Sequence, residues 1–274
     1  MEVVREDGTT SNDMTDILQV WQDSFQTLLN PTGNNSISET QNEINESDGS
    51  YLNEHISLEE LIRAIRSLKN NKASGIDEIP GEVLKNPKLV KFLLTLFNKC
   101  VETGMVPNIW SKTIINPIPK SSTADSRDPS NYRGIALVPV IYKIYCNILN
   151  NRLVFWEEEH SVLHDEQNGF RKGRRTIDHI STLTSIIECR KLKRMSTYAA
   201  SIDLKEAYDS INRQLLFTKL KDLGISGAIS NALRSLYSDV RSCVRVNGFS
   251  SLVFRKFRIE TRMFIISLDV QFLY

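Results

Sequence analysis

Cysteine is scarce in this sequence, and the spacing of the few cysteines excludes the sites that this residue usually builds. Cys100, Cys146, Cys189 and Cys243 lie more than forty residues apart and form no CxxC pair. A cysteine zinc site or a disulfide framework would show closer spacing. We therefore expect buried or idle thiols in a reducing compartment.

Long apolar runs are absent as well. The opening residues, MEVVREDGTTSND, hold no apolar segment typical of a signal peptide, and no run of eighteen apolar residues occurs in the chain. No internal repeat is present. These absences predict an intracellular protein with no membrane partner, and they leave the cytoplasm and the nucleus as alternatives.

Basic residues are nearly missing from the first part of the chain. Residues 1–60 hold one basic and 13 acidic side chains, whereas residues 61–274 hold 33 basic and 20 acidic ones. The overall charge of +1 therefore hides a body that carries +13. Such a body attracts polyanions, of which nucleic acid is the commonest.

The order of apolar and turn-forming residues predicts a mixture of helices and strands. Ser57 and Glu60 form a capping box at the start of one helix, and residues 31–49 are polar and acidic, which predicts a flexible linker. The expected helices cover residues 14–29, 57–68, 88–102, 138–156, 176–193, 213–223 and 227–237, and the expected strands cover 112–120, 132–137, 197–202 and 242–248. Because these elements do not alternate strictly as βαβ units, the sequence favours an α+β fold.

One pair of strands has a distinctive sequence. KTIINPIPK (residues 112–120) contains Pro117 and Pro119, which cannot donate ladder hydrogen bonds, so this segment must be an edge strand or a hairpin arm. A polar loop joins it to YRGIAL (residues 132–137). The two segments predict a long hairpin with Lys120 and Arg133 near its tip.

Asp203 is the strongest single candidate for chemistry. It lies in SIDLKEAYDS (residues 201–210) and closes the apolar stretch that begins at Tyr198, and a carboxylate at a strand end can hold a hard cation. A helix cap or a turn is the alternative for an aspartate at this place. His160 and His164 are spaced i, i+4, but they lack the HExxH pattern, so we expect a surface or partly buried pair.

Four blocks of the sequence are informative together: NNKASGIDEIPGEVLK (residues 70–85), WSKTIINPIPK…DPSNYRGIAL (110–137), QNGFRKGRRTIDHI (167–180) and DLKEAYD (203–209). In this order they resemble four blocks of the reverse transcriptases of LINE-type (non-LTR) retrotransposons. The first resembles the family's opening motif, the second its fingers motif, the third the block after it, and DLKEAYD the first catalytic motif. The WxxxF segment at Trp21 and Phe25 also resembles one that often precedes such domains.

The resemblance implies a right-hand polymerase fold and roles for individual residues. Asp203 would bind the two catalytic Mg²⁺ ions, with help from the backbone carbonyl of Leu204, and Tyr208 would be the steric gate against ribonucleotides. Lys120 and Arg133 would grip the incoming triphosphate. Without the family context, Tyr208 reads as a core aromatic, and Lys120 with Arg133 as a solvated pair.

A basic block is expected to contact nucleic acid. The resemblance places Gln167 and Phe170 near the templating base. We expect the Phe170 ring to pack inside the protein rather than to stack on a base. The residues expected beside a phosphate backbone are Arg171, Lys172, Arg174 and Arg175. A plain basic turn is the alternative.

The resemblance ends after FRIET (residues 257–261), where RMFIISLDVQFLY replaces the family's QG, SP and ADD motifs. A truncation or a change of reading frame near Thr261 would explain this. We expect an N-terminal helix segment (1–30), an acidic flexible linker (31–54), an incomplete reverse transcriptase domain of fingers and partial palm (55–261), and a non-matching tail (262–274).

The function expected from these observations is RNA-directed DNA synthesis in an intact relative, with an RNA template, a DNA primer, dNTPs and Mg²⁺, and with an endonuclease domain elsewhere in the element. This chain is expected to be inactive, because the later catalytic motifs do not occur in it. A non-catalytic nucleic-acid-binding remnant is the alternative. A metal-dependent nuclease that uses Asp203 and Asp209 would need further acidic ligands.

Overall fold

The computed structural model describes residues 2–5, 7–30, 50–202 and 212–255. The α-helices are α1 (Met14–Leu29), α2 (Leu58–Arg66), α3 (Gly81–Leu84), α4 (Pro87–Thr103), α5 (Val140–Glu159), α6 (Thr176–Leu192), α7 (Arg213–Asp222) and α8 (Ala228–Tyr237). The strands are β1 (Val3–Val4), β2 (Thr10–Ser11), β3 (Lys112–Pro119), β4 (Tyr132–Leu137), β5 (Arg241–Val246), β6 (Phe249–Ser250) and β7 (Phe254–Arg255). The 3-10 turns are η1 (Ser50–Asn53), η2 (Asn108–Ser111) and η3 (Pro129–Asn131). This mixture confirms the α+β class.

Helix ends follow the capping residues in the sequence. The Ser57 hydroxyl accepts the Glu60 backbone N–H at 3.2 Å, and the Glu60 carboxylate accepts the Ser57 N–H at 2.8 Å, so the predicted capping box is confirmed. Helix α4 begins at an Asn86 cap and ends at Gly104, whose φ of 64° lies in the left-handed region.

The main sheet has the strand order β4-β3-β5-β6, with β7 also paired to β5. Strands β3 and β4 form the predicted antiparallel hairpin, while β3 and β5 run parallel. Among the described strands, β5 pairs with residues 112–115 of β3, so at Pro117 and Pro119 the described neighbour of β3 is β4. The missing proline N–H groups therefore break no ladder there.

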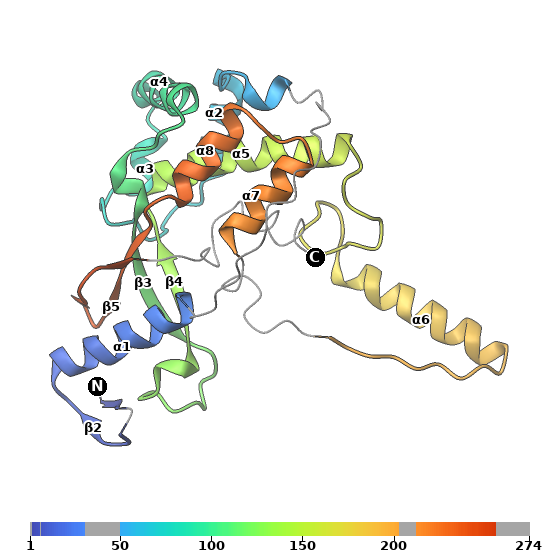
Figure 1. The fold of residues 1–274 in the computed structure, drawn as a ribbon, viewed down its shortest axis with the longest axis horizontal. Helices are drawn as coiled ribbons and strands as arrows, with labels where there is room; N and C mark the ends of the chain where they lie inside the picture. The colour runs from blue at the N-terminus through green and yellow to red at the C-terminus, as the bar shows by residue number, and fades with distance from the viewer. Residues whose placement is uncertain (1, 6, 31–49, 203–211, 256–274) are drawn as a thin grey trace.

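Helix α1 packs on one face of this sheet, as Figure 1 shows at the lower left. The Trp21 ring meets Tyr132 of β4 edge-on with centroids 4.6 Å apart, and Phe25 packs beside it. A second apolar cluster forms between the two elements, and its buried members are Val3, Ile17, Trp21, Phe25, Leu29, Ile115, Val244, Val246 and Phe254. The buried apolar side chains of α1 thus lie on the face that contacts the sheet.

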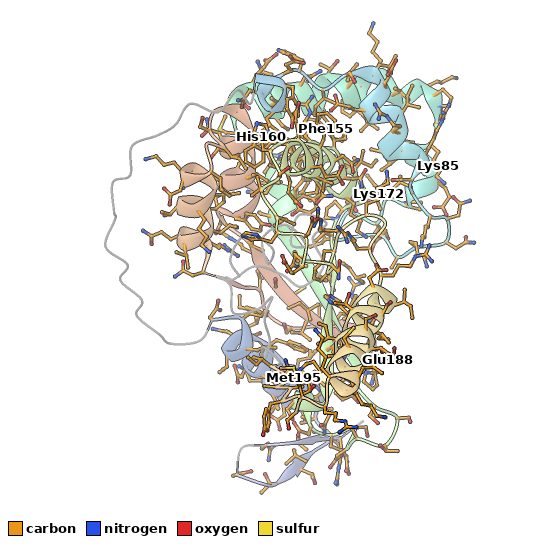
Figure 2. The ribbon with its side chains drawn as sticks, turned by 90° about the vertical axis from the view of Figure 1, so that its right-hand side faces the viewer. Lys85, Phe155, His160, Lys172, Glu188 and Met195 are labelled. Carbon is orange, nitrogen blue, oxygen red and sulfur yellow. The ribbon has the colours of Figure 1, made fainter. Side chains whose placement is uncertain are left out.

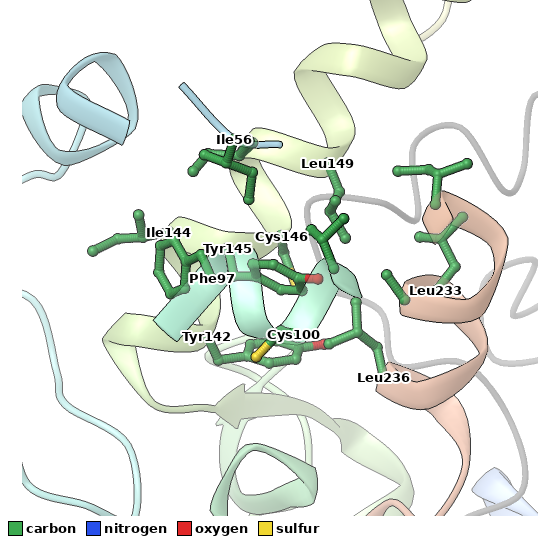
Figure 3. Packing of buried hydrophobic residues seen from close by; sticks show 14 of the residues in the cluster. Ile56, Phe97, Cys100, Tyr142, Ile144, Tyr145, Cys146, Leu149, Leu233 and Leu236 are labelled. Atoms are coloured by element: carbon green, nitrogen blue, oxygen red, sulfur yellow. The ribbon is translucent and has the colours of Figure 1, made fainter. Parts of the chain in front are cut away.

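The larger core lies among helices α2, α4, α5, α7 and α8. Figure 3 shows Phe97, Tyr142 and Tyr145 at its centre, with Cys100 and Cys146 beside them. Burial raises the pKa of the Cys100 thiol to about 11 and that of Cys146 to about 12. Both thiols therefore stay protonated at neutral pH and act as small apolar groups.

Helix α6 stands apart from both clusters. It extends away from the rest of the described chain (Figure 1), and none of its residues is buried. Its large apolar side chains are exposed, and Ile177, Ile180 and Leu183 are 51–58% exposed. Among the described helices, none combines the length and the apolar character that crossing a bilayer requires.

The strand expected at residues 197–202 does not form, and this prediction was wrong. The segment has neither helix nor strand, and Tyr198 and Ile202 are 94% and 88% exposed. An apolar segment becomes a strand only when a neighbouring strand accepts its backbone hydrogen bonds, and no described strand lies beside this one.

Candidate nucleic-acid and nucleotide site

The hairpin β3–β4 has two different faces. Residues that oppose each other across an antiparallel pair share a face, and the face alternates along each strand. Gly134 and Tyr132 lie on the face that α1 covers, because they lie against Phe25 and Trp21, and Ile115 belongs to the apolar cluster on that face. The residues between them therefore point to the opposite face.

Lys120 and Arg133 share that opposite face. Arg133 is paired with Ile118, and Lys120 follows two residues later, where its backbone N–H bonds the Asn131 carbonyl at 2.8 Å. The two cations are therefore diagonal neighbours near the tip, at about 7–8 Å between backbone positions. Both side chains are exposed. The predicted position of both residues near the hairpin tip is confirmed.

The two cations differ in how much of their hydrogen-bonding capacity is used. The Lys120 ammonium donates to the Ser130 carbonyl at 2.8 Å, which leaves two of its three donors. The Arg133 guanidinium makes no hydrogen bond or ion pair with any residue in the described ranges. The tip can therefore present a point charge and a planar fork to an anion.

The tip itself is held by the N-terminal strand. The Val4 N–H donates to the Arg127 carbonyl at 3.2 Å, and the Arg127 guanidinium lies 3.9 Å from the Glu2 carboxylate. The Asp125 carboxylate also accepts two bonds from Arg127 at 3.0 Å, which lowers the pKa of Asp125. These contacts lie at the end of the hairpin beyond Lys120 and support the loop that carries Ser130.

The predicted catalytic residues Asp203, Leu204 and Tyr208 lie outside the described residues, and so does Asp209. In the part of the chain that is described, no group of three His, Cys, Asp or Glu side chains is placed to hold a metal ion. The described residues therefore supply no complete ligand set for Mg²⁺. An aspartate carboxylate and a backbone carbonyl are the oxygen donors that this ion prefers.

The basic block forms the loop between α5 and α6. Arg171 points inward: its guanidinium donates to the carbonyls of His164 at 3.0 Å and Gln167 at 3.4 Å. Arg174 pairs with the exposed Asp165 carboxylate at 3.1 Å. Arg171 therefore closes the loop, whereas the charge of Arg174 stays at the surface.

Other side chains of this loop are more accessible. Arg175 is exposed, and its backbone N–H donates to the Asp178 carboxylate at 2.6 Å, at the start of α6. Phe170 is 58% exposed, so the expectation that it fills structure was wrong for the described part of the chain. The reason is that α6, which follows this loop, adds no buried side chain beside it.

Lys172 lines a groove of about 660 Å³ beside α5. Figure 2 shows it below Phe155, which also lines this groove. Arg152 forms the floor and is 7% exposed. Its guanidinium makes a bidentate pair with the Glu60 carboxylate at 2.7 and 3.0 Å and donates to the carbonyls of Leu52, Glu54 and His55.

This buried pair has a marked effect on Glu60. Burial alone would raise the pKa of Glu60, but the hydrogen bonds from Arg152 and from the Ser57 backbone outweigh burial, and the pKa is lowered.

Glu157, by contrast, is 4% exposed, and one of its carboxylate oxygens has no partner in the described structure. Burial raises the pKa of Glu157, although the charge of Arg171 opposes the rise.

The two histidines behave as expected for a surface pair. The His160 ring stacks on Trp156 at 4.7 Å, and its Nδ1 lies 2.9 Å from the Trp156 carbonyl. His164 is exposed, and its backbone carbonyl serves Arg171.

Comparison with known proteins decides the family. The family described as "Reverse transcriptase (RNA-dependent DNA polymerase)" matches residues 118–259, which is more than half of the chain. The chain belongs to the reverse transcriptase family. The matched range of this reverse transcriptase chain begins within β3 and includes the hairpin tip, the basic loop, α7, α8 and β5.

The relatives are retrotransposon proteins. The chain is 29% identical over 199 residues to the probable RNA-directed DNA polymerase from transposon BS of Drosophila melanogaster, a match that covers 72% of this chain and 22% of that protein. It is 24% identical to the RNA-directed DNA polymerase from mobile element jockey of the same organism, over 72% of this chain and 22% of the relative.

A third relative is the Pol polyprotein of the type-1 retrotransposable element R2 of Popillia japonica, which is 27% identical over 70% of this chain and 26% of its own length. The resemblance to the reverse transcriptases of non-LTR retrotransposons is therefore confirmed. The chain spans about a quarter or less of the curated relatives that it matches.

Proposed function

We propose that this chain is the fingers and partial palm of a non-LTR reverse transcriptase, and that the exposed face of its hairpin binds phosphate groups of the nucleotide and of nucleic acid. In this proposal Lys120 and Arg133 grip the triphosphate. The observation that carries it is that both cations share one exposed face of the hairpin, opposite the face that α1 covers. An arginine fork and a lysine point charge are complementary ways to bind phosphate.

The basic loop extends the proposed surface toward the nucleic-acid backbone. Lys172, Arg174 and Arg175 are exposed cations in this role. Gln167 is assigned to the region of the templating base, as the family resemblance implies. Arg171 is assigned to loop closure, because its donors are engaged with backbone carbonyls.

Catalysis is assigned to residues outside the described ranges. Asp203 and the carbonyl of Leu204 would hold Mg²⁺, and Tyr208 would exclude the ribose 2′-hydroxyl. When bound, Mg²⁺ supplies charge stabilisation for phosphoryl transfer. The 274 residues contain no ADD motif, so the ligand set is incomplete and this polypeptide binds nucleic acid without polymerising dNTPs.

The experiment is a binding titration by fluorescence anisotropy. A labelled RNA template annealed to a DNA primer is titrated with the wild-type chain, with Lys120→Gln/Arg133→Gln, and with Arg66→Gln, which removes an exposed cation from α2. Loss of two charge-assisted contacts predicts affinity at least about tenfold weaker for the double variant. Equal affinity for the double variant and the α2 control would contradict the proposal.

A further inference from the structure

Strand β5 adds a third cation to the face of the sheet opposite α1. The last pair between β3 and β5 joins Ile115 to Val244, and both side chains belong to the cluster under α1. Arg245 is the next residue in β5, so it points to the opposite face. That is the face that carries Lys120 and Arg133.

The Arg245 side chain is built into the sheet rather than free at the surface. It is partly buried, and its Nε–H is buried without a hydrogen-bond partner among the described residues. The guanidinium lies close enough to Cys243 to oppose the rise that burial causes in the pKa of that thiol. A partly buried cation is normally paired with a carboxylate, and Arg245 forms no ion pair within the described ranges.

A neighbour in the same strand provides the comparison. Arg241 lies four residues earlier on the same face, is exposed, and pairs with the Asp239 carboxylate at 2.9 Å. The Asp239 carboxylate therefore already neutralises the charge of Arg241. Arg245 differs in having no carboxylate partner among the described residues, so an anion that reaches its guanidinium would neutralise its charge.

The distance between Arg133 and Arg245 fits successive phosphates of one ligand. Arg133 opposes Ile118, whereas Arg245 is level with Asn116, and β3 lies between their two strands. Two strand spacings and an offset of two residues place the backbones of the two arginines roughly 12 Å apart. A single phosphate could contact both arginines only if their side chains converged on it. Successive phosphates of a strand that lies across β3 could contact one arginine each.

We propose that Arg245 is a phosphate-binding residue that extends the site of Lys120 and Arg133 across the sheet. Its ligand is a phosphate oxygen, either of a single-stranded nucleic-acid backbone or of a nucleoside triphosphate. This inference rests on the proposed function, because it adds a residue to the same face. Arg245 positions the bound strand or triphosphate and takes no part in proton transfer.

The test compares Arg245→Gln and Arg245→Lys with Arg241→Gln as the matched control. Each protein is titrated with labelled single-stranded RNA at several salt concentrations and, separately, with a fluorescent dNTP. Arg245→Gln is expected to bind at least tenfold more weakly and to lower the salt slope for RNA by about 0.7, the value for one lost contact to a single strand. Arg241→Gln is expected to stay within twofold of the wild type.

The pattern of loss identifies the ligand. Weaker RNA binding alone assigns Arg245 to the strand backbone, weaker dNTP binding alone assigns it to the triphosphate, and weaker binding of both assigns it to both. Arg245→Gln that matches Arg241→Gln with both ligands overturns the inference. If Arg245→Gln does not fold, as judged by thermal unfolding, Arg245→Lys decides: wild-type affinity for both ligands overturns the inference, and reduced affinity with an unchanged salt slope supports it.

The same titrations separate this inference from the proposed function. If Lys120→Gln/Arg133→Gln also binds RNA and dNTP like the wild type, the proposed hairpin site fails as a whole. If that double variant loses binding and Arg245→Gln does not, only the role of Arg245 is wrong.

Discussion

Removing the Arg152 side chain should destabilise the protein more than any change at an exposed arginine. Arg152 is 7% exposed and makes a bidentate pair with Glu60, which is itself 25% exposed, and three further bonds to the carbonyls of Leu52, Glu54 and His55. It therefore joins η1, the start of α2 and the middle of α5. Arg152→Ala leaves a partly buried carboxylate and three carbonyls without their donor.

The size of the effect follows from the cost of breaking a buried ion pair on one side. That cost is about 3–5 kcal/mol, which exceeds the contribution of an exposed pair several-fold. With a urea m-value of about 2–3 kcal/mol/M for a chain of this length, the unfolding midpoint should fall by roughly 1–2 M. Trp110 and Trp156 lie in the same cluster, so tryptophan fluorescence reports the transition.

Arg63→Ala is the matched control, because Arg63 is exposed and lines the same groove. It should change the free energy of unfolding by no more than about 0.5 kcal/mol. A double cycle with Glu60→Ala should give a coupling of about 1–3 kcal/mol. An Arg152→Ala midpoint within about 0.3 M of that of the wild type would contradict the expected cost of breaking the buried pair.

Three further predictions concern pH, packing and catalysis. Because the folded-state pKa of Glu60 is lowered, the stabilisation by its carboxylate is present above the unfolded pKa of about 4.5 and is lost as the pH falls through the lowered value. As the pH is lowered below about 4.5, the urea midpoint should therefore fall more steeply in the wild type than in Glu60→Gln. Gly134→Ala should cost about 1–3 kcal/mol of unfolding free energy, because a Cβ there would lie 2.7 Å from the Phe25 ring, whereas Gly169→Ala, with no contact under 3.4 Å, should be nearly neutral; equal thermal midpoints for the two would contradict this. In a primer-extension assay with Mg²⁺, the chain should incorporate no dNTP, and Asp203→Ala should leave the background unchanged; incorporation that disappears in Asp203→Ala would show that the chain is an active polymerase.

Much of the local structure could be predicted because its signals are local. The capping box at Ser57 and Glu60 and the glycine at 104 fix helix ends through backbone bonds only a few residues apart. The hairpin could be predicted from two β-rich segments and a polar loop. The register then placed Lys120 and Arg133 near the tip, as expected.

The long-range pairing could not be predicted in this way. The parallel contact of β3 with β5 joins residues about 130 positions apart, and no turn chemistry connects them. The expected strand at residues 197–202 failed for the related reason that strand formation depends on a partner. The close contact at Gly75 could not be predicted either. Gly75 lies against the backbone of Val138 and Pro139, which leaves no room for a Cβ, and its turn-like sequence does not indicate this contact.

Two charged residues show which features of the site could not be predicted from the sequence. Arg152 lies in the middle of a helix, where nothing in its neighbours indicates a buried pair with Glu60, ninety-two residues earlier. Arg245 had a weak signal, since it stands between two valines in SCVRVNG and period-two alternation separates it from them. Only the sheet register shows which cations share its face.

Photocrosslinking maps where nucleic acid lies on the surface and so tests whether the hairpin, β5 and the basic loop form the binding site. Single-stranded RNA carrying 4-thiouridine is bound to the wild-type chain at low salt and irradiated, and the crosslinked peptides are identified by mass spectrometry. We expect crosslinks in residues 112–137, which hold the hairpin, in residues 241–250, which hold β5 and β6, and in the basic loop at residues 167–175. Crosslinks confined to α1 on the covered face, or to α2 and α4, would contradict this expectation.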